Sequence, residues 1–159
     1  MRLSALVKAL CLVALSIGSL TALAEPLSPV LAHDAKGQPF DMHKLDGKVS
    51  LLYYWSTSCA VCRDSLPELR ANALGWKAKP FMLLTLNVDK QERDWAAYEQ
   101  IASQTLRNPP PGLVSLRAEG APPPKLPLML VVDARGEVKA RYEGRVAAEA
   151  WDAVAGLLP

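Results

Sequence analysis

Residues 49–62 read VSLLYYWSTSCAVC, and this stretch decides the fold. Its first part, VSLLYYW, is nearly all apolar and rich in β-forming residues, which is typical of a strand buried on both faces. Beyond it the pattern changes, and apolar residues recurring at three- and four-residue spacing predict a helix with an inner face formed by Leu66, Leu69, Ala73 and Leu74. Two cysteines, Cys59 and Cys62, therefore lie where the strand passes into the helix.

This position suits redox chemistry. At a helix N-terminus the free amides and the helix dipole favour an anion, so the thiolate of Cys59 would be stabilised there. Cys62 follows three residues later on the same helix face, within the ~4.4–6.8 Å Cα separation that a disulfide accepts. We expect Cys59 to be the exposed attacking thiol and Cys62 to resolve the mixed disulfide.

Two other roles for the pair are considered. A structural disulfide closing so short a loop would add only roughly 2 kcal/mol, which a domain of this size does not need. A metal site for Cu(I), or for Zn(II) with two further ligands, would draw on His33 and His43, the only histidines. Both are expected in a surface hairpin, and their spacing does not point at the cysteines. Metal binding remains the alternative from another class.

The N-terminus has the features of an export signal. Arg2 and Lys8 precede an uncharged stretch of 16 residues, Ala9–Ala24, which ends on the small-x-small pattern Ala22-Leu23-Ala24. We predict a signal peptide over residues 1–24, cleavage before Glu25, and a periplasmic protein. An uncleaved inner-membrane anchor is the alternative, although the stretch is shorter than the ~20 residues that span a bilayer comfortably.

Cleavage would change the composition. Lysine plus arginine would fall from 18 to 16, equal to the 16 aspartates and glutamates, so the mature chain would be formally neutral. The sequence contains no stripe of basic residues of the kind that indicates nucleic-acid binding. Cys11 would also be removed, which leaves Cys59 and Cys62 as the two cysteines of one domain, residues 25–159.

The remaining pattern alternates strands and helices. Residues 32–48 are predicted to form a short N-terminal hairpin, and FMLLTLNVD (residues 81–89) a second buried strand. An amphipathic helix follows, with an inner side formed by Trp95, Tyr98, Ile101 and Ala102. A proline-rich connection, whose LVSL (residues 113–116) could form a strand, leads to a hairpin over residues 128–144 and a last helix with Trp151, Val154 and Leu157 inside. This order predicts an α/β fold with a mixed sheet flanked by helices.

At this point the sequence resembles the thioredoxin fold, and more narrowly the exported TlpA/ResA/DsbE-type thiol–disulfide oxidoreductases. Trp55 stands four residues before Cys59, where the family has a tryptophan near the redox centre, and Pro67 stands at its helix-kinking proline. Pro127, six residues before Asp133, matches the family's cis-proline facing the cysteines, preceded here by Leu126. The resemblance covers nearly all of residues 25–159.

The resemblance implies a function and partners. It implies a protein thiol–disulfide oxidoreductase with Cys59 and Cys62 catalytic, and with Trp55, Leu126 and Pro127 contributing to binding of a partner's extended chain. Protein disulfides would be the substrates and a membrane-embedded thiol protein the electron donor, with no dissociable cofactor. A monomer is expected.

The sequence departs from the family's pattern around the cysteines. Ser58 replaces a common tryptophan, Ala60-Val61 lacks the usual proline, and Tyr53 stands where cytoplasmic thioredoxins have a buried aspartate. Strong oxidants of this fold stabilise the thiolate, and Ala60-Val61 offers it neither charge nor side-chain hydrogen bond. We therefore expect a reductant, with a DsbA-like disulfide donor as the alternative and the Ser58 hydroxyl as the open question.

Overall fold

The computed structural model describes residues 25–106, 109 and 111–159. The predicted signal peptide, residues 1–24, lies outside these residues. The chain forms, in order, β1 (Glu25–Pro26), β2 (Ala32–His33), the 3-10 helix η1 (Met42–Leu45), β3 (Val49–Trp55), α1 (Ala60–Gly75), β4 (Phe81–Asn87), α2 (Glu92–Thr105), β5 (Leu113–Ala118), β6 (Leu128–Val132), β7 (Glu137–Glu143) and α3 (Ala148–Ala155).

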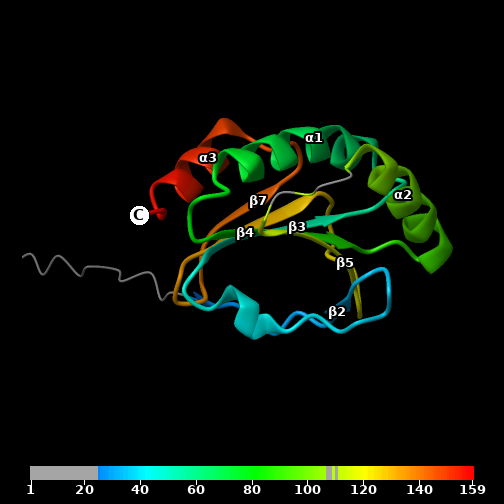
Figure 1. The fold of residues 1–159 in the computed structure, drawn as a ribbon, viewed down its shortest axis with the longest axis horizontal. Coiled ribbons are helices and arrows are strands. Elements are labelled where there is room, and N and C mark those ends of the chain that lie inside the picture. Colours follow the sequence, from blue (N-terminus) through cyan, green and yellow to red (C-terminus); the bar gives the residue numbers. More distant parts are fainter. Residues whose placement is uncertain (1–24, 107–108, 110) are drawn as a thin grey trace, which may run out of the picture.

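One mixed sheet of seven strands organises the molecule, in the order β1-β7-β6-β3-β4-β5-β2 (Figure 1). The strands β3, β4 and β5 run parallel, and β6 and β7 pair antiparallel to their neighbours. The predicted α/β class with a central mixed sheet is confirmed, including the strand over LVSL and the hairpin after it. Because β3 is central, the cysteines that follow it start from the most enclosed part of the sheet.

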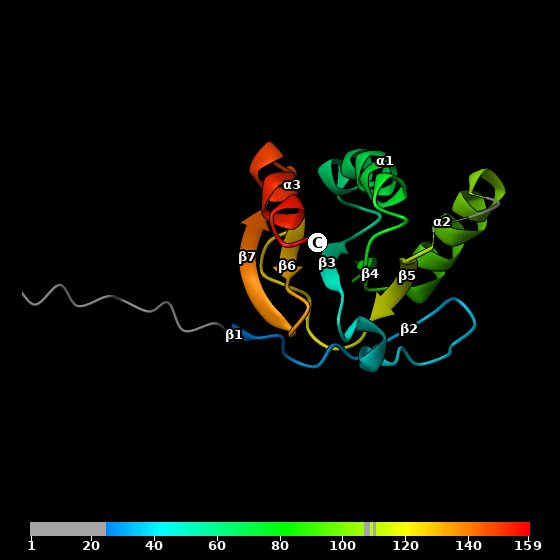
Figure 2. The same cartoon turned by 60° about the vertical axis from the view of Figure 1, so that its left-hand side comes forward.

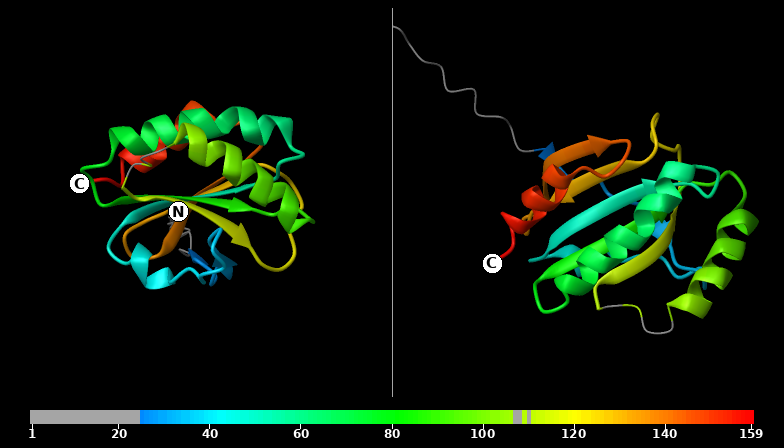
Figure 3. Two further views of the ribbon diagram at one scale, coloured as in Figure 1. Left: turned by 45° about the vertical axis from the view of Figure 1, so that its right-hand side comes forward. Right: turned by 90° about the horizontal axis from the view of Figure 1, so that it is seen from above.

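The two faces of the sheet are covered differently. All three α-helices lie on one face, with α1 between α3 and α2 (Figures 2 and 3), and the N-terminal segment with η1 covers the other. Side chains alternate accordingly along β3: Leu51 and Tyr53 enter the core under the helices, and Leu52 enters the core under the N-terminal segment. The strand is therefore buried on both faces, as its sequence predicts.

The inner faces of the helices differ from the sequence pattern at two exposed positions, and α3 ends at Ala155, before the predicted inner residue Leu157, which packs half-buried against the core from beyond the helix. Leu66, Leu69 and Ala73 of α1 are buried as expected, whereas Leu74 is 52% exposed. In α2, Ile101 is 67% exposed although it was predicted to face inward. Leu74 directly follows the buried Ala73, and Ile101 directly precedes the buried Ala102. Neighbouring helix residues point about 100° apart, so each leucine or isoleucine side chain lies outside the narrow stripe that contacts the core.

The N-terminal segment forms a tight hairpin and also extends the sheet at both edges. His33 bridges Pro39 across the predicted turn, with a hydrogen bond from the Phe40 amide to the Ala32 carbonyl at 2.8 Å. The short strand β1 pairs with β7, whereas β2 pairs with β5 at the opposite edge. The hairpin is thus confirmed, and the segment crosses the whole sheet. In the part of the chain that the structure describes, no helix has the length and apolarity to cross a membrane.

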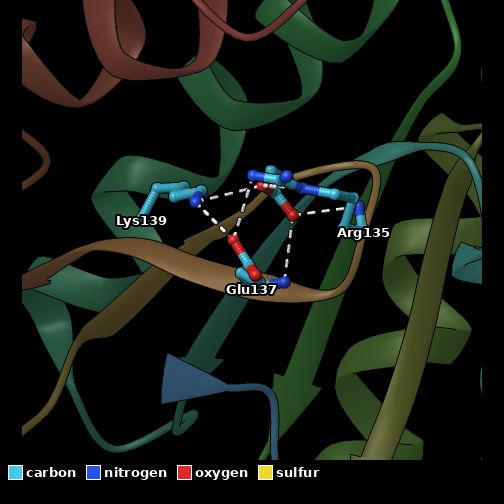
Figure 4. A network of polar contacts seen from close by, with 4 residues as sticks. Arg135, Glu137 and Lys139 are labelled. Atoms are coloured by element: carbon cyan, nitrogen blue, oxygen red, sulfur yellow. Dashed lines mark hydrogen bonds and ion pairs between the residues drawn. The ribbon is translucent and has the colours of Figure 1, made fainter. Parts of the chain in front are cut away.

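The β6–β7 turn is held by a polar cluster around Asp133 (Figure 4). Its Oδ1 accepts hydrogen bonds from the amides of Arg135 and Glu137 at 2.9 and 3.0 Å, and Lys139 Nζ lies 3.2 Å from its Oδ2. Burial alone would raise the pKa of Asp133, but these amides and Lys139 outweigh it and lower the pKa to about 2. The carboxylate is therefore part of the turn.

Candidate active site

The cysteine pair forms a disulfide at the start of α1. The Cα atoms of Cys59 and Cys62 are 5.2 Å apart. Cys59 is the N-cap of the helix, and its Sγ accepts a hydrogen bond from the Cys62 amide at 3.2 Å. Cys62 has no exposed surface, whereas Cys59 is partly exposed. Cys59 is therefore the cysteine of the pair that an external thiol or disulfide can approach.

The local backbone explains this placement. The strand β3 ends at Trp55, where its carbonyl accepts from the Val88 amide at 2.9 Å. A turn follows, with the Cys59 amide donating to the Ser56 carbonyl at 3.1 Å, and the first helical bond runs from the Arg63 amide to the Cys59 carbonyl. The Cys62 amide, which a helix leaves without a carbonyl partner, is free to donate to the sulfur.

Neutral hydroxyl groups lie behind the buried cysteine. Tyr53, which is fully buried, donates from its hydroxyl to the Cys62 carbonyl at 3.2 Å. Burial raises the pKa of Tyr53 to about 12. Ser65, also buried, donates to the Val61 carbonyl at 3.0 Å. Both groups therefore remain protonated at neutral pH and hold the first turns of α1 in place.

Trp55 packs in the same apolar cluster as Cys62, with Cys59 against that cluster. Its ring meets the ring of Tyr98 edge to face, with centroids 4.7 Å apart. The side chain has no exposed surface, and its Nε1 has no hydrogen-bond acceptor among the residues that the structure describes. In this state Trp55 supports the site from beneath and offers no surface to a partner.

The Leu126–Pro127 peptide bond is cis, as the resemblance implies. Leu126 is half-buried and packs against the apolar cluster that contains Cys62 and Trp55. Pro127 is buried, and its carbonyl accepts from the Gly144 amide at 2.9 Å. Four of the five predicted site residues, Cys59, Cys62, Trp55 and Leu126, thus meet in or against one cluster, with Pro127 directly beside it in the chain.

Sequence reasoning missed a second group of residues that holds the turn before Cys59. Asp89, only 6% exposed, accepts from the Ser56 hydroxyl at 2.6 Å and from the Thr57 amide at 2.8 Å, both at Oδ1. Its Oδ2 accepts from Asn87 Nδ2 at 3.1 Å, and Arg117 donates to its backbone carbonyl at 2.7 Å. The sequence held a partial signal, because the polar residues Asn87 and Asp89 end the apolar stretch FMLLTLNVD, but it did not indicate which turn they contact.

The histidines considered as metal ligands have other surroundings. The ring of His33 packs edge-on against Trp95, with centroids 6.0 Å apart, and His43 is an exposed partner of Asp46 at 3.1 Å. Within residues 25–106, 109 and 111–159, no group of three or more histidine, cysteine, aspartate or glutamate side chains is arranged to hold a metal ion.

Comparison with known proteins identifies relatives. The model of the AhpC/TSA family matches residues 24–153. No curated protein matches the chain in sequence. Among solved structures, a protein assigned as the thiol:disulfide interchange protein DsbE of Chlorobium tepidum has a TM-score of 0.63 at 21% identity, covering 83% of this chain and 94% of that one.

Two further solved structures have a similar fold. The thio-disulfide isomerase of Thermus thermophilus gives a TM-score of 0.60 at 24% identity, covering 84% of this chain and 95% of its own. The exposed lipoprotein thioredoxin of Streptococcus pneumoniae gives 0.60 at 16% identity, covering 81% and 98%. The resemblance to thioredoxin-fold proteins of this type, inferred from residues such as Pro67 and Pro127, is thereby confirmed at the level of the fold.

Proposed function

We propose that this chain, which belongs to the AhpC/TSA family, is a thiol–disulfide oxidoreductase that uses its cysteine pair to reduce disulfides of protein partners. The observation that carries the proposal is the unequal exposure of two bonded cysteines at a helix N-terminus. Cys59 can be reached from outside, and Cys62 is enclosed beside it. That arrangement suits one attacking and one resolving thiol.

The proposed reaction runs in two exchanges. The Cys59 thiolate attacks one sulfur of the partner's disulfide, which forms a mixed disulfide and releases the first partner thiolate. The Cys62 thiolate then attacks Cys59 Sγ, closes the intramolecular disulfide and releases the second. The partner gains two electrons and its two thiolates take up two protons, while the Cys59–Cys62 pair loses two of each. The described disulfide corresponds to the end of this cycle.

Whether the protein reduces or oxidises its partners depends on how strongly the Cys59 thiolate is stabilised. A strongly oxidising pair needs a low thiolate pKa, because that stabilises the reduced form. Here the described donor to Cys59 Sγ is the Cys62 amide at 3.2 Å, and the side chains of Ala60 and Val61 supply none. One amide at a helix N-terminus resembles the thioredoxin situation more than that of DsbA. We therefore propose that the reduction potential of the pair lies in the half of the range nearer to thioredoxin than to DsbA.

The proposal also covers the electron donor, the contacts with the partner and the location of the protein. A reductant working outside the cytoplasm must itself be re-reduced, so a thiol protein embedded in the membrane would supply electrons to the Cys59–Cys62 disulfide. The half-buried Leu126, next to Pro127 and against the cysteine cluster, would contact the partner's chain, whereas the fully buried Trp55 would act by supporting the pair. The protein would work in the periplasm after removal of residues 1–24, as a monomer.

Trapping tests this function. Cys62→Ala, expressed in the native host, should accumulate mixed disulfides that a reducing agent releases, because nothing resolves the bond at Cys59. Cys59→Ala is the matched control, since it loses one cysteine of the same pair and leaves the buried sulfur. If Cys59→Ala traps as many partners as Cys62→Ala, or neither traps any, the proposed exchange is wrong.

A further inference from the structure

The turn before Cys59 contains a chain of hydroxyl groups that ends on a buried carboxylate. The Oγ atoms of Ser56 and Ser58 are 2.8 Å apart, and Ser56 Oγ lies 2.6 Å from Asp89 Oδ1. Ser56 Oγ also accepts from the Ser58 amide at 3.2 Å. Ser56 and Asp89 are 8% and 6% exposed, so water contributes little to the contact between them, whereas Ser58 is exposed.

The number of protons fixes the direction of this chain. A carboxylate offers acceptors only, so the single hydroxyl proton of Ser56 points to Asp89. Ser56 Oγ then has two lone pairs, and the Ser58 amide takes one of them. The contact between the two hydroxyls can form only if Ser58 donates its proton to Ser56 Oγ. The Ser58 proton is therefore directed away from the neighbouring sulfur.

We infer that Asp89 is a positioning residue that keeps the Cys59–Cys62 couple reducing. It draws the Ser56 and Ser58 protons toward itself, so that Ser58 donates no hydrogen bond to the Cys59 thiolate. Its buried negative charge, fixed by the Thr57 amide two residues before Cys59, also disfavours that thiolate. Both effects destabilise the reduced form and lower the reduction potential.

Other charges near the pair do not cancel this effect. Arg117 donates to the backbone carbonyl of Asp89 and to Asn87 Oδ1, and not to the carboxylate. The charged side chains next to the pair in the sequence or on adjoining loops are exposed, namely Arg63 and Asp64 on α1, Lys90 after β4 and Arg145 before α3. Arg70, further along α1, is half-buried and donates to the Tyr98 hydroxyl. Exposed charges are screened by water, whereas Asp89 acts from within the protein.

Asp89→Asn is the principal test, and this inference rests on the proposed thiol–disulfide exchange. We expect the equilibrium of the purified protein with glutathione to shift about tenfold toward the dithiol, or ~30 mV for a two-electron couple. The pH midpoint for alkylation of Cys59 in the reduced protein should fall in parallel. A purely structural role for Asp89 would lower thermal stability and leave this midpoint where it is.

Two variants provide the comparison. Asp64→Asn removes the same charge from an exposed position five residues after Cys59, and it should shift the equilibrium less than twofold. Ser58→Ala should also change it less than twofold, because its hydroxyl donates to Ser56 and not to the sulfur. If Asp89→Asn shifts no more than Asp64→Asn, or Ser58→Ala makes the couple several-fold more reducing, the inference is overturned.

A second route covers a failure of Asp89→Asn to fold, which is a real risk because an amide there would face the Nδ2 of Asn87. Ser56→Ala removes the acceptor of the Ser58 proton and frees it to bond the thiolate. The equilibrium should then shift toward the dithiol by about threefold, and no shift would contradict the inference. All these readouts are differences from wild type, so they stand apart from the trapping of partners and from the absolute potential.

Discussion

The hydroxyl of Tyr53 donates a hydrogen bond to the backbone carbonyl of Cys62, across 3.2 Å, inside the protein. This contact joins the central strand β3 to the first turn of α1, so the strand fixes the position of the buried sulfur. It also shows what stands behind Cys62: a phenol with a pKa raised by burial to about 12, which stays protonated and cannot accept a proton at neutral pH.

Replacing Tyr53 by phenylalanine should therefore affect stability and not proton transfer. Loss of the buried hydrogen bond should lower the free energy of unfolding by about 1 kcal/mol, measured with urea. The pH profile of disulfide exchange between pH 6 and 9 should keep its shape. Tyr142→Phe is the matched control, because the half-buried Tyr142 donates to the Glu149 carbonyl at the same 3.2 Å in an exposed hydrogen bond, which should contribute less to stability. A changed pH profile in Tyr53→Phe would mean that the phenol takes part in proton transfer.

Asp133 should make the fold sensitive to acid. Its folded pKa of about 2 lies below the ordinary value of 3.8, so its stabilisation is complete above about pH 4 and is lost as the pH falls through 2. The partly exposed cluster reduces the effect to about 1–2 kcal/mol. Asp133→Asn should flatten the dependence of unfolding free energy on pH in this window, and the exposed Asp64→Asn should not. An unchanged slope in Asp133→Asn would contradict the cluster's role.

Gly112 should tolerate no side chain. Its φ is +84°, and a Cβ there would lie 2.6 Å from the Phe81 carbonyl oxygen at the start of β4. Gly112→Ala should cost roughly 2–4 kcal/mol of unfolding free energy, because backbone strain and a backbone clash add. Gly120→Ala is the control for strain alone, since Gly120 has a φ of +90° and open space. Equal losses in the two variants would show that the strand gives way.

Trp55 should act through its apolar surface. Its Nε1 donates no hydrogen bond, so Trp55→Phe loses packing without leaving a partner unpaired. We expect a loss of about 1–2 kcal/mol for Trp55→Phe and about 3–5 kcal/mol for Trp55→Ala in urea unfolding. A loss in Trp55→Phe as large as in Trp55→Ala would indicate a polar contact of the indole that the structure does not contain.

The sequence predicted the parts of the site that depend on local pattern or on the family resemblance. The run VSLLYYW and the following helical spacing placed Cys59 at a helix N-terminus, and the resemblance carried by the spacing of Pro127 to Asp133 implied the cis bond that the structure contains. Each of these signals is read within about ten residues. The apolar runs also predicted the core strands β3, β4 and β6, although not the order in which they pair.

Long-range polar contacts were not predictable in this way. Asp89 meets Ser56 33 positions away along the chain, and nothing in either local pattern indicates the other. The predicted burial of Leu74 and Ile101 was wrong for a related reason. Periodicity shows which residues share a helix face, but it does not show how wide the contact between that face and the core is. The edge strands β1 and β2 are two residues each, too short to give an alternation.

The reduction potential of the Cys59–Cys62 couple tests the proposed function most directly. The purified protein would be equilibrated with glutathione buffers of graded ratio, and the fraction of disulfide counted by alkylation and intact mass. We predict a potential closer to the ~−270 mV of thioredoxin than to the ~−120 mV of DsbA. A value near that of DsbA would contradict the assignment as a reductant and would make the protein a disulfide donor.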